Sequence, residues 1–79
     1  MKLKKNIAVS DSGFIFNPAT GDSYSINPIG SMIVKMMKED KSDEQIVKSL
    51  LDHFMTDRAT VEKDLYDFKN MLSSLKLAE

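Results

Sequence analysis

The sequence predicts an α+β fold in which a three-stranded antiparallel sheet is followed by three helices, in a winged helix-turn-helix-like arrangement. Short strand-like segments separated by turn residues occupy residues 6–26, and three amphipathic stretches at helical spacing follow them. The chain has 79 residues, of which 42% are hydrophobic, and this size and composition suit a small globular protein. We therefore expect residues 1–79 to form a single domain.

The strand region contains three segments joined by two turns. Residues 6–9, 14–16 and 23–26 either alternate polar and apolar side chains or combine aromatic and β-branched ones, as strands do. Asp-Ser-Gly at 11–13 is a turn signal, and residues 17–22 place proline early and glycine late, which is typical of a tight hairpin connection. The simplest assembly is a meander in which the first and third strands are the edges.

The helical region contains three capped, amphipathic segments. Asn27, which precedes a proline, is a suitable N-cap, and Ser42 with Gln45 forms a capping box. Asp57 is the expected N-cap of the third helix, which runs to about residue 75. The apolar stripes expected to face the core are Ile29, Met32, Ile33, Met36 and Met37, then Ile46, Val47, Leu50, Leu51 and Phe54, and finally Val61, Leu65, Phe68, Leu72 and Leu75.

Composition excludes several functional classes. The 11 Lys and Arg residues are balanced by 12 Asp and Glu, so charge gives no reason to expect nucleic acid or an anionic membrane as the partner. The chain has no cysteine, which excludes disulfides, thiolate zinc sites and a cysteine nucleophile. No apolar run approaches the roughly 20 residues of a membrane helix, and the apolar stretch after the basic N-terminus is too short for a secretory signal. We expect a cytoplasmic protein.

The polar residues do not form a catalytic pattern. His53 is the single histidine and lies near the end of the second helix, where interaction with the helix dipole is the simplest interpretation. Glu62, Asp64 and Asp67 are expected on a solvated face of the third helix, and a recognition role for Asp64 is the sharper alternative. No serine lies in a Gly-x-Ser-x-Gly elbow, and no glycine-rich phosphate loop occurs. We expect no enzymatic activity, no metal and no cofactor.

The third strand is the feature most open to a partner. Lys4 and Lys5 are expected to guard the first strand, whereas residues 22–27 contain no lysine. Such an edge can accept an extended peptide through main-chain hydrogen bonds. Two other interpretations remain open at this point: the edge is covered by the protein's own helix, or by a second copy of the chain in a homodimer. A winged helix also suggests a DNA-binding regulator, although acidic residues accompany the basic ones on the helices.

Three segments, in consistent order and spacing, together resemble one known family. Residues 21–30, Gly-Asp-Ser-Tyr-Ser-Ile-Asn-Pro-Ile-Gly, look like the "G..Y.LN..G" signature of PqqD-like proteins (coenzyme PQQ synthesis protein D). Residues 42–54 resemble the second helix of that family, and residues 64–72 are similar to its "D-V-x-x-F-L-x-x-L" helix. The chain departs from the family pattern at two places. Lys69 replaces the usual leucine, which leaves the composition of the groove wall open to question. Leu-Lys-Leu at 75–77 replaces Gly-Leu-Leu, which affects only the C-terminal cap.

The resemblance implies a non-catalytic recognition element for ribosomally made, post-translationally modified peptides (RiPPs). In that family the leader of a precursor peptide adds as a strand to the third β-strand, lies against the third helix, and is presented to a modifying enzyme, often a radical SAM enzyme. Pyrroloquinoline quinone (PQQ) is one product among those of several pathways. Carried onto this chain, the strand contacts are Ser23, Tyr24, Ser25 and Ile26, and the helix contacts are Asp64, Leu65, Phe68, Met71 and Leu72. For Leu65, Phe68 and Leu72, core packing is the alternative interpretation.

Overall fold

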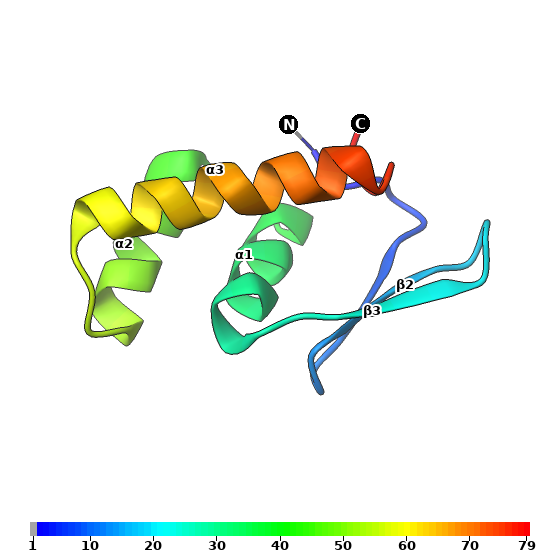
Figure 1. The fold of residues 1–79 in the computed structure, drawn as a ribbon, viewed down its shortest axis with the longest axis horizontal. Coiled ribbons are helices and arrows are strands. Elements are labelled where there is room, and N and C mark those ends of the chain that lie inside the picture. Colours follow the sequence, from blue (N-terminus) through cyan, green and yellow to red (C-terminus); the bar gives the residue numbers. More distant parts are fainter. Residues whose placement is uncertain (1) are drawn as a thin grey trace.

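The computed structural model describes residues 2–79 and contains the predicted order of elements. The antiparallel sheet has the strand order β1-β2-β3, formed by β1 (Ala8–Ser10), β2 (Phe14–Asn17) and β3 (Asp22–Ser25). Three helices follow: α1 (Pro28–Lys38), α2 (Asp43–His53) and α3 (Arg58–Ser74). Figure 1 shows the strands at one end of the molecule, with the long helix α3 lying across the other two helices. The predicted α+β class and the meander are confirmed.

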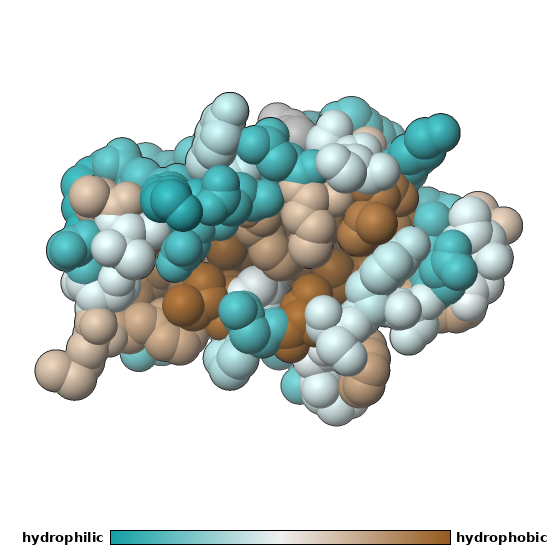
Figure 2. All heavy atoms as spheres, viewed as in Figure 1, coloured by the Kyte–Doolittle hydropathy of each residue, from teal (hydrophilic) through white to brown (hydrophobic). Residues whose placement is uncertain are grey.

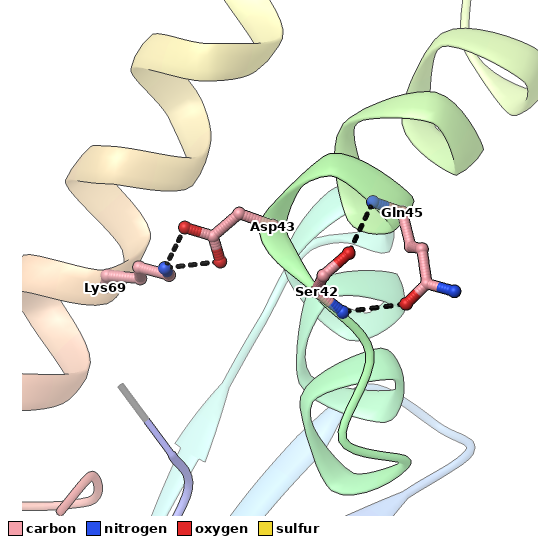
Figure 3. Close-up of polar contacts among 4 residues, drawn as sticks. All are labelled: Ser42, Asp43, Gln45 and Lys69. Atoms are coloured by element: carbon pink, nitrogen blue, oxygen red, sulfur yellow. Dashed lines mark hydrogen bonds and ion pairs between the residues drawn. The ribbon is translucent and has the colours of Figure 1, made fainter.

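Each helix begins at the N-cap that the sequence predicts. The side-chain oxygens of Asn27 and Asp57 each accept a hydrogen bond from the backbone N–H three residues on, at 2.7 and 2.8 Å. Ser42 and Gln45 close the predicted capping box at the start of α2, through bonds of 3.2 and 2.8 Å (Figure 3). These local signals explain why the helix starts could be placed from the sequence.

The C-terminus of α3 is closed by a residue other than the glycine usual at that position. Lys76 adopts a left-handed conformation with φ of 59°. Its N–H donates to the carbonyl of Ser73 at 3.1 Å, and the N–H of Leu77 donates to the carbonyl of Leu72 at 2.9 Å. This pair of bonds is the Schellman arrangement, in which glycine is favoured because a Cβ disfavours the left-handed conformation. The departure at residues 75–77 therefore does lie in the C-terminal cap.

The sheet turns one face to the core and one to solvent. The register places Val9, Ile15 and Tyr24 side by side, and Ile15 is fully buried. Because strand residues alternate between faces, Phe14 and Phe16 point the other way and are 44% and 42% exposed. The Phe-Ile-Phe segment is apolar on both faces, so its pattern alone does not say which face is buried.

Residues 2–4 lie beside residues 77–79 (Figure 1). Leu3 and Ala78 form an isolated antiparallel bridge, and the N–H of Lys4 donates to the carbonyl of Leu77 at 3.0 Å. Leu3 and Leu77 are both buried, at 7% and 0% exposure, so the ends of the chain contribute to the core.

The expectation that lysines guard the first strand is wrong. β1 begins at Ala8, so Lys4 and Lys5 lie before the strand and not along its edge. The reason is that the preceding residues serve a different purpose: Leu3 and Ile7 are buried in the core, and the chain between them turns, with the Ile7 N–H bonded to the Lys4 carbonyl at 3.2 Å.

Among residues 2–79, none of the helices combines the length and apolar character that a bilayer crossing requires.

Candidate functional site

The free side of β3 presents unpaired backbone groups. Among residues 2–79, β2 is the only strand beside β3, and the Ile26 N–H donates to the Gly13 carbonyl at 2.9 Å, which continues the β2–β3 register. In an antiparallel pair, successive residues alternately face the partner strand and face away from it. Tyr24 therefore faces β2 as Ile26 does, while the N–H and C=O groups of Ser23 and Ser25 point outward. Within residues 2–79, no hydrogen bond joins these groups to a helix or loop.

A shallow groove lies next to this edge, between the start of α1 and the middle of α3. It has a volume of about 290 Å³, and we call it the α1–α3 groove. Figure 2 shows apolar side chains gathered in a hollow between the polar outer side of α3 and the strands. The residues that line the groove are Asn27, Ile29, Gly30, Ile33, Asp64, Asp67, Phe68 and Met71.

The floor of the groove depends on the absence of a side chain at Gly30. A Cβ built on Gly30 would lie 2.8 Å from Cε1 of Phe68 and 3.4 Å from its Cζ, and 3.2 Å from Oδ1 of Asn27. The ring of Phe68 therefore rests against the first turn of α1, where only glycine leaves room for it. This contact joins the last glycine of the "G..Y.LN..G" signature to the aromatic residue of the third-helix motif.

The groove carries acidic groups and no basic one. Asp67 is ion-paired with Lys63 at 3.1 Å, and this hydrogen bond raises the pKa of the Lys63 ammonium. Asp64 is half-buried and makes no ion pair or hydrogen bond with the other described residues. Of residues 2–79, no lysine or arginine lines the groove. A ligand with positive charge, or with N–H groups to donate, fits this arrangement.

The structure separates the predicted contact residues into two groups. Asp64, Phe68 and Met71 line the α1–α3 groove and are half-buried. Leu65 and Leu72 are 5% and 0% exposed and belong to the core. For these two leucines, burial favours the core-packing alternative over direct contact with a ligand, because their side chains are enclosed by the body of the protein.

The predicted strand residues also differ in what they present. Ser23 and Ser25 are exposed, whereas Tyr24 and Ile26 are half-buried and pack against the core. Ile26 follows the end of β3 rather than belonging to it. The backbone groups available to a partner are therefore those of the two serines.

Lys69, the departure from the family pattern on α3, does not line the groove. Its Nζ reaches both carboxylate oxygens of Asp43 at 2.5 Å, at the N-terminal end of α2 (Figure 3). The Lys69 side chain is 18% exposed, so its stem is packed while its charge links α3 to α2. The wall of the α1–α3 groove is therefore formed without Lys69.

The sequence did not identify the α1 side of the groove. Ile29, Gly30 and Ile33 line it, although two of them belong to the stripe expected to face the core. Gly30 was the available signal, since a glycine in the first turn of a helix carries an entropic cost and indicates a close approach by another group.

A hollow larger than the α1–α3 groove lies elsewhere. It has a volume of about 770 Å³ and lies between the β1–β2 turn, α1 and the end of α2, where His53 Nδ1 contacts the Ser49 carbonyl oxygen at 2.8 Å. An ion pair of 2.7 Å between Lys35 and Asp11 is part of its lining, and the hydrogen bond from Lys35 lowers the pKa of Asp11. Its lining contains Ile26, one of the predicted strand contacts, but none of the predicted α3 contacts, so we place the candidate site at β3 and the α1–α3 groove.

Comparison with known proteins identifies the fold and the family of the chain. The chain is similar to the solved structure of TbiB1 in complex with the TbiA(β) leader peptide, with 32% sequence identity, a TM-score of 0.87, and coverage of 100% of this chain and 95% of that chain. It also has the fold of a lasso peptide synthetase B1 complexed with the leader peptide, with 20% identity, a TM-score of 0.84, and coverage of 99% and 95%. No curated protein sequence matches it significantly. The family model of coenzyme PQQ synthesis protein D (PqqD) matches residues 13–78, and the chain therefore belongs to the PqqD family.

Proposed function

We propose that this chain binds the leader of a ribosomally made precursor peptide and presents it to a modifying enzyme. The leader adds as a fourth strand to the free side of β3 and lies beside the α1–α3 groove. The observation that carries the proposal is the outward direction of the N–H and C=O groups of Ser23 and Ser25, next to an apolar groove. The similarity to TbiB1, whose structure contains a leader peptide, supports the same conclusion.

Main-chain pairing and side-chain contacts have separate roles in this proposal. The backbone of Ser23 and Ser25 holds any extended peptide in register. Every second leader side chain then points toward the side of the sheet on which Tyr24 lies, where Phe68 and Met71 offer apolar contact. Leu65 and Leu72 hold α3 in position from within the core, and we do not assign them a direct contact.

The proposed role is binding without catalysis, without a cofactor and in the cytoplasm. The backbone groups and apolar side chains at the site bind and orient, but they do not transfer protons at neutral pH. His53 lies in the last turn of α2 and does not line the groove. The chemistry would be performed by the partner enzyme, with a radical SAM enzyme as the first to test.

A proline substitution at Ser25 tests the strand addition. Ser25→Pro removes an N–H that points outward and leaves the Tyr24 and Ile26 bonds to β2 in place. Ser25→Ala is the matched control, because it removes the hydroxyl and keeps the N–H. With a fluorescent TbiA(β) leader peptide as the probe, followed by anisotropy, we expect binding to wild type and Ser25→Ala and a loss of at least tenfold in affinity for Ser25→Pro.

If a folded Ser25→Pro protein binds the peptide as tightly as wild type does, β3 is not the docking edge. Circular dichroism of both variants establishes whether the fold is retained. Failure of the TbiA(β) peptide to bind wild type would direct the same comparison to peptides selected from a random display library, and no proline-sensitive peptide among them would refute strand addition.

The acidic wall of the groove is tested by a pair of neutral substitutions on the same helix. Asp64→Asn removes a half-buried carboxylate without a partner, whereas Asp67→Asn removes one that is already paired with Lys63. We expect weaker peptide binding for Asp64→Asn and little change for Asp67→Asn. Equal effects of the two substitutions would show that only the overall charge matters.

The DNA-binding alternative gains no support from the placement of the basic residues. Arg58 at the start of α3 is bonded to Glu44 at 2.6 Å, and Lys63 is paired with Asp67. These α3 cations are exposed and already paired with carboxylates, while a DNA-binding helix directs its cations to phosphates. The homodimer alternative uses the same free edge, and sedimentation of wild type and Ser25→Pro separates it from peptide binding.

A further inference from the structure

We infer that the solvent face of the sheet is a second recognition surface for the docked peptide, formed by Phe14 and Phe16. This inference rests on the proposed strand addition and goes beyond it, because it specifies side chains of the ligand. It requires large apolar side chains at two peptide positions, i and i+2, on the side opposite the α1–α3 groove.

The first observation is the exposure of the two rings. Phe14 and Phe16 are 44% and 42% exposed and lie two residues apart on β2, so they share one face of the sheet. The other large hydrophobic residues exposed among residues 2–79, Met55 and Tyr66, lie singly outside the sheet. A pair of adjacent exposed rings is a feature of binding surfaces, whereas single exposed residues are common.

The second observation is the register between β2 and β3. Phe14 lies opposite Ser25, and Phe16 lies opposite Ser23. These serines are the residues whose backbone groups point outward, so they would form the hydrogen-bonded pairs with an added strand. The two peptide residues opposite them would project their side chains onto the same solvent face as the phenylalanines. The identity of the outward-facing residues thus fixes which peptide positions approach the rings.

The third observation is the small size of the side chains between the rings and the peptide. Neighbouring strands are about 4.8 Å apart, so an added strand would lie roughly 9–10 Å from β2. Ser23 and Ser25 are small, and they leave a trough between each ring and the corresponding peptide side chain. Aromatic and long side chains reach neighbours about 7–8 Å away on one face of a sheet. A Leu, Phe or Tyr side chain of the peptide and the ring can therefore lean toward each other over the serine and meet. A short or charged side chain would leave the ring in water.

The probe for this inference is a display library of random twelve-residue peptides, selected on the wild-type protein. The selected peptides are first divided by their sensitivity to Ser25→Pro. Among the sensitive ones, we expect large apolar residues to be enriched at two positions spaced i and i+2, in addition to the position that faces the groove. Synthetic peptides with serine at those two positions should bind wild type several-fold more weakly.

The matching changes in the protein are Phe14→Thr and Phe16→Thr, which remove the ring and introduce a β-branched residue that suits a strand. We expect each to weaken the binding of the selected peptides roughly two- to fivefold, the range of cross-strand aromatic contacts. Phe14→Leu and Phe16→Leu should restore most of the affinity, because the surface remains apolar. Tyr66→Ala, which removes an exposed ring from α3, should have no effect.

The outcomes distinguish this inference from the proposed function. If no selected peptide is sensitive to Ser25→Pro, the proposed strand addition itself fails. If sensitive peptides lack the apolar i and i+2 pair and bind the threonine variants normally, strand addition stands and the second surface is refuted. If sedimentation shows that wild type self-associates and the threonine variants do not, the rings serve contact between two copies, and the inference is also overturned.

Discussion

Replacing Gly30 by alanine tests whether the contact between α1 and the Phe68 ring determines the shape of the groove. The added Cβ would lie 2.8 Å from Cε1 of Phe68, about 0.6 Å closer than the 3.4 Å at which ordinary contact begins. The ring must therefore move away from α1, and this displacement alters the groove that Phe68 lines. We expect Gly30→Ala to weaken peptide binding even where the protein stays folded.

The effect of Gly30→Ala on stability combines two opposing contributions. Alanine favours the helix over glycine by about 0.5–1 kcal/mol. Forcing an extra carbon against a packed ring costs about 1–3 kcal/mol, and the half-buried ring of Phe68 can yield, which favours the lower end of that range. The net result is a small destabilisation, on the order of 0–1 kcal/mol.

A double-mutant cycle with Phe68→Leu separates the two contributions. Leucine lacks the ring atoms Cε1 and Cζ that meet the new Cβ, so in this background Gly30→Ala should stabilise the protein by about 0.5–1 kcal/mol. Urea unfolding followed by circular dichroism gives the four free energies. If the effect of Gly30→Ala is the same in both backgrounds, the Phe68 ring is not the reason that glycine occupies this position.

Three further changes follow from the structure. Lys76→Gly should raise the free energy of unfolding by about 1 kcal/mol, because Lys76 holds a left-handed conformation that glycine adopts without a Cβ penalty, and a lower urea midpoint would contradict this. Lys69→Leu should leave peptide affinity unchanged, because Lys69 faces Asp43 and not the groove, and a severalfold loss of affinity would show otherwise. The N–H of Thr60 holds the pKa of Asp57 below its ordinary 3.8, so the stability from this cap is fully present above 3.8 and is lost as pH falls through the lower folded value. Thermal melts from about pH 6 to pH 2 should show wild type losing stability relative to Asp57→Asn, in which the cap does not titrate, and a constant difference would refute the assignment.

The elements that the sequence predicts well are those encoded by local contacts. The caps at Asn27, Ser42 and Asp57 each depend on a side chain and a backbone group three residues away, so a short stretch of sequence contains the whole interaction. The order of the strands follows from two short turns. The free edge at β3 is a consequence of that order, which is why it could be anticipated.

The features that the sequence did not reveal depend on contacts between distant residues. Nothing near Leu3 indicates that it will pair with Ala78, and for this reason the sequence pattern does not reveal that Lys4 and Lys5 precede the first strand. Phe14 points outward because its neighbour Ile15 points into the core, and neighbouring strand residues face opposite sides. The segment is apolar throughout, so its sequence does not show which of the two residues is exposed. Lys69 is similar: its partner is on another helix, 26 residues away in the sequence.

The bridge between Leu3 and Ala78 brings the ends of the chain together on a part of the molecule that contributes no residue to the groove. A short linker between the ends, with the chain reopened at the fully exposed Met55, would give a circular permutant that begins with α3 and keeps β3 continuous with α1. Such a permutant would place both new ends beside the start of α3, so that a fused reporter could be moved to a different part of the molecule without touching either wall of the α1–α3 groove.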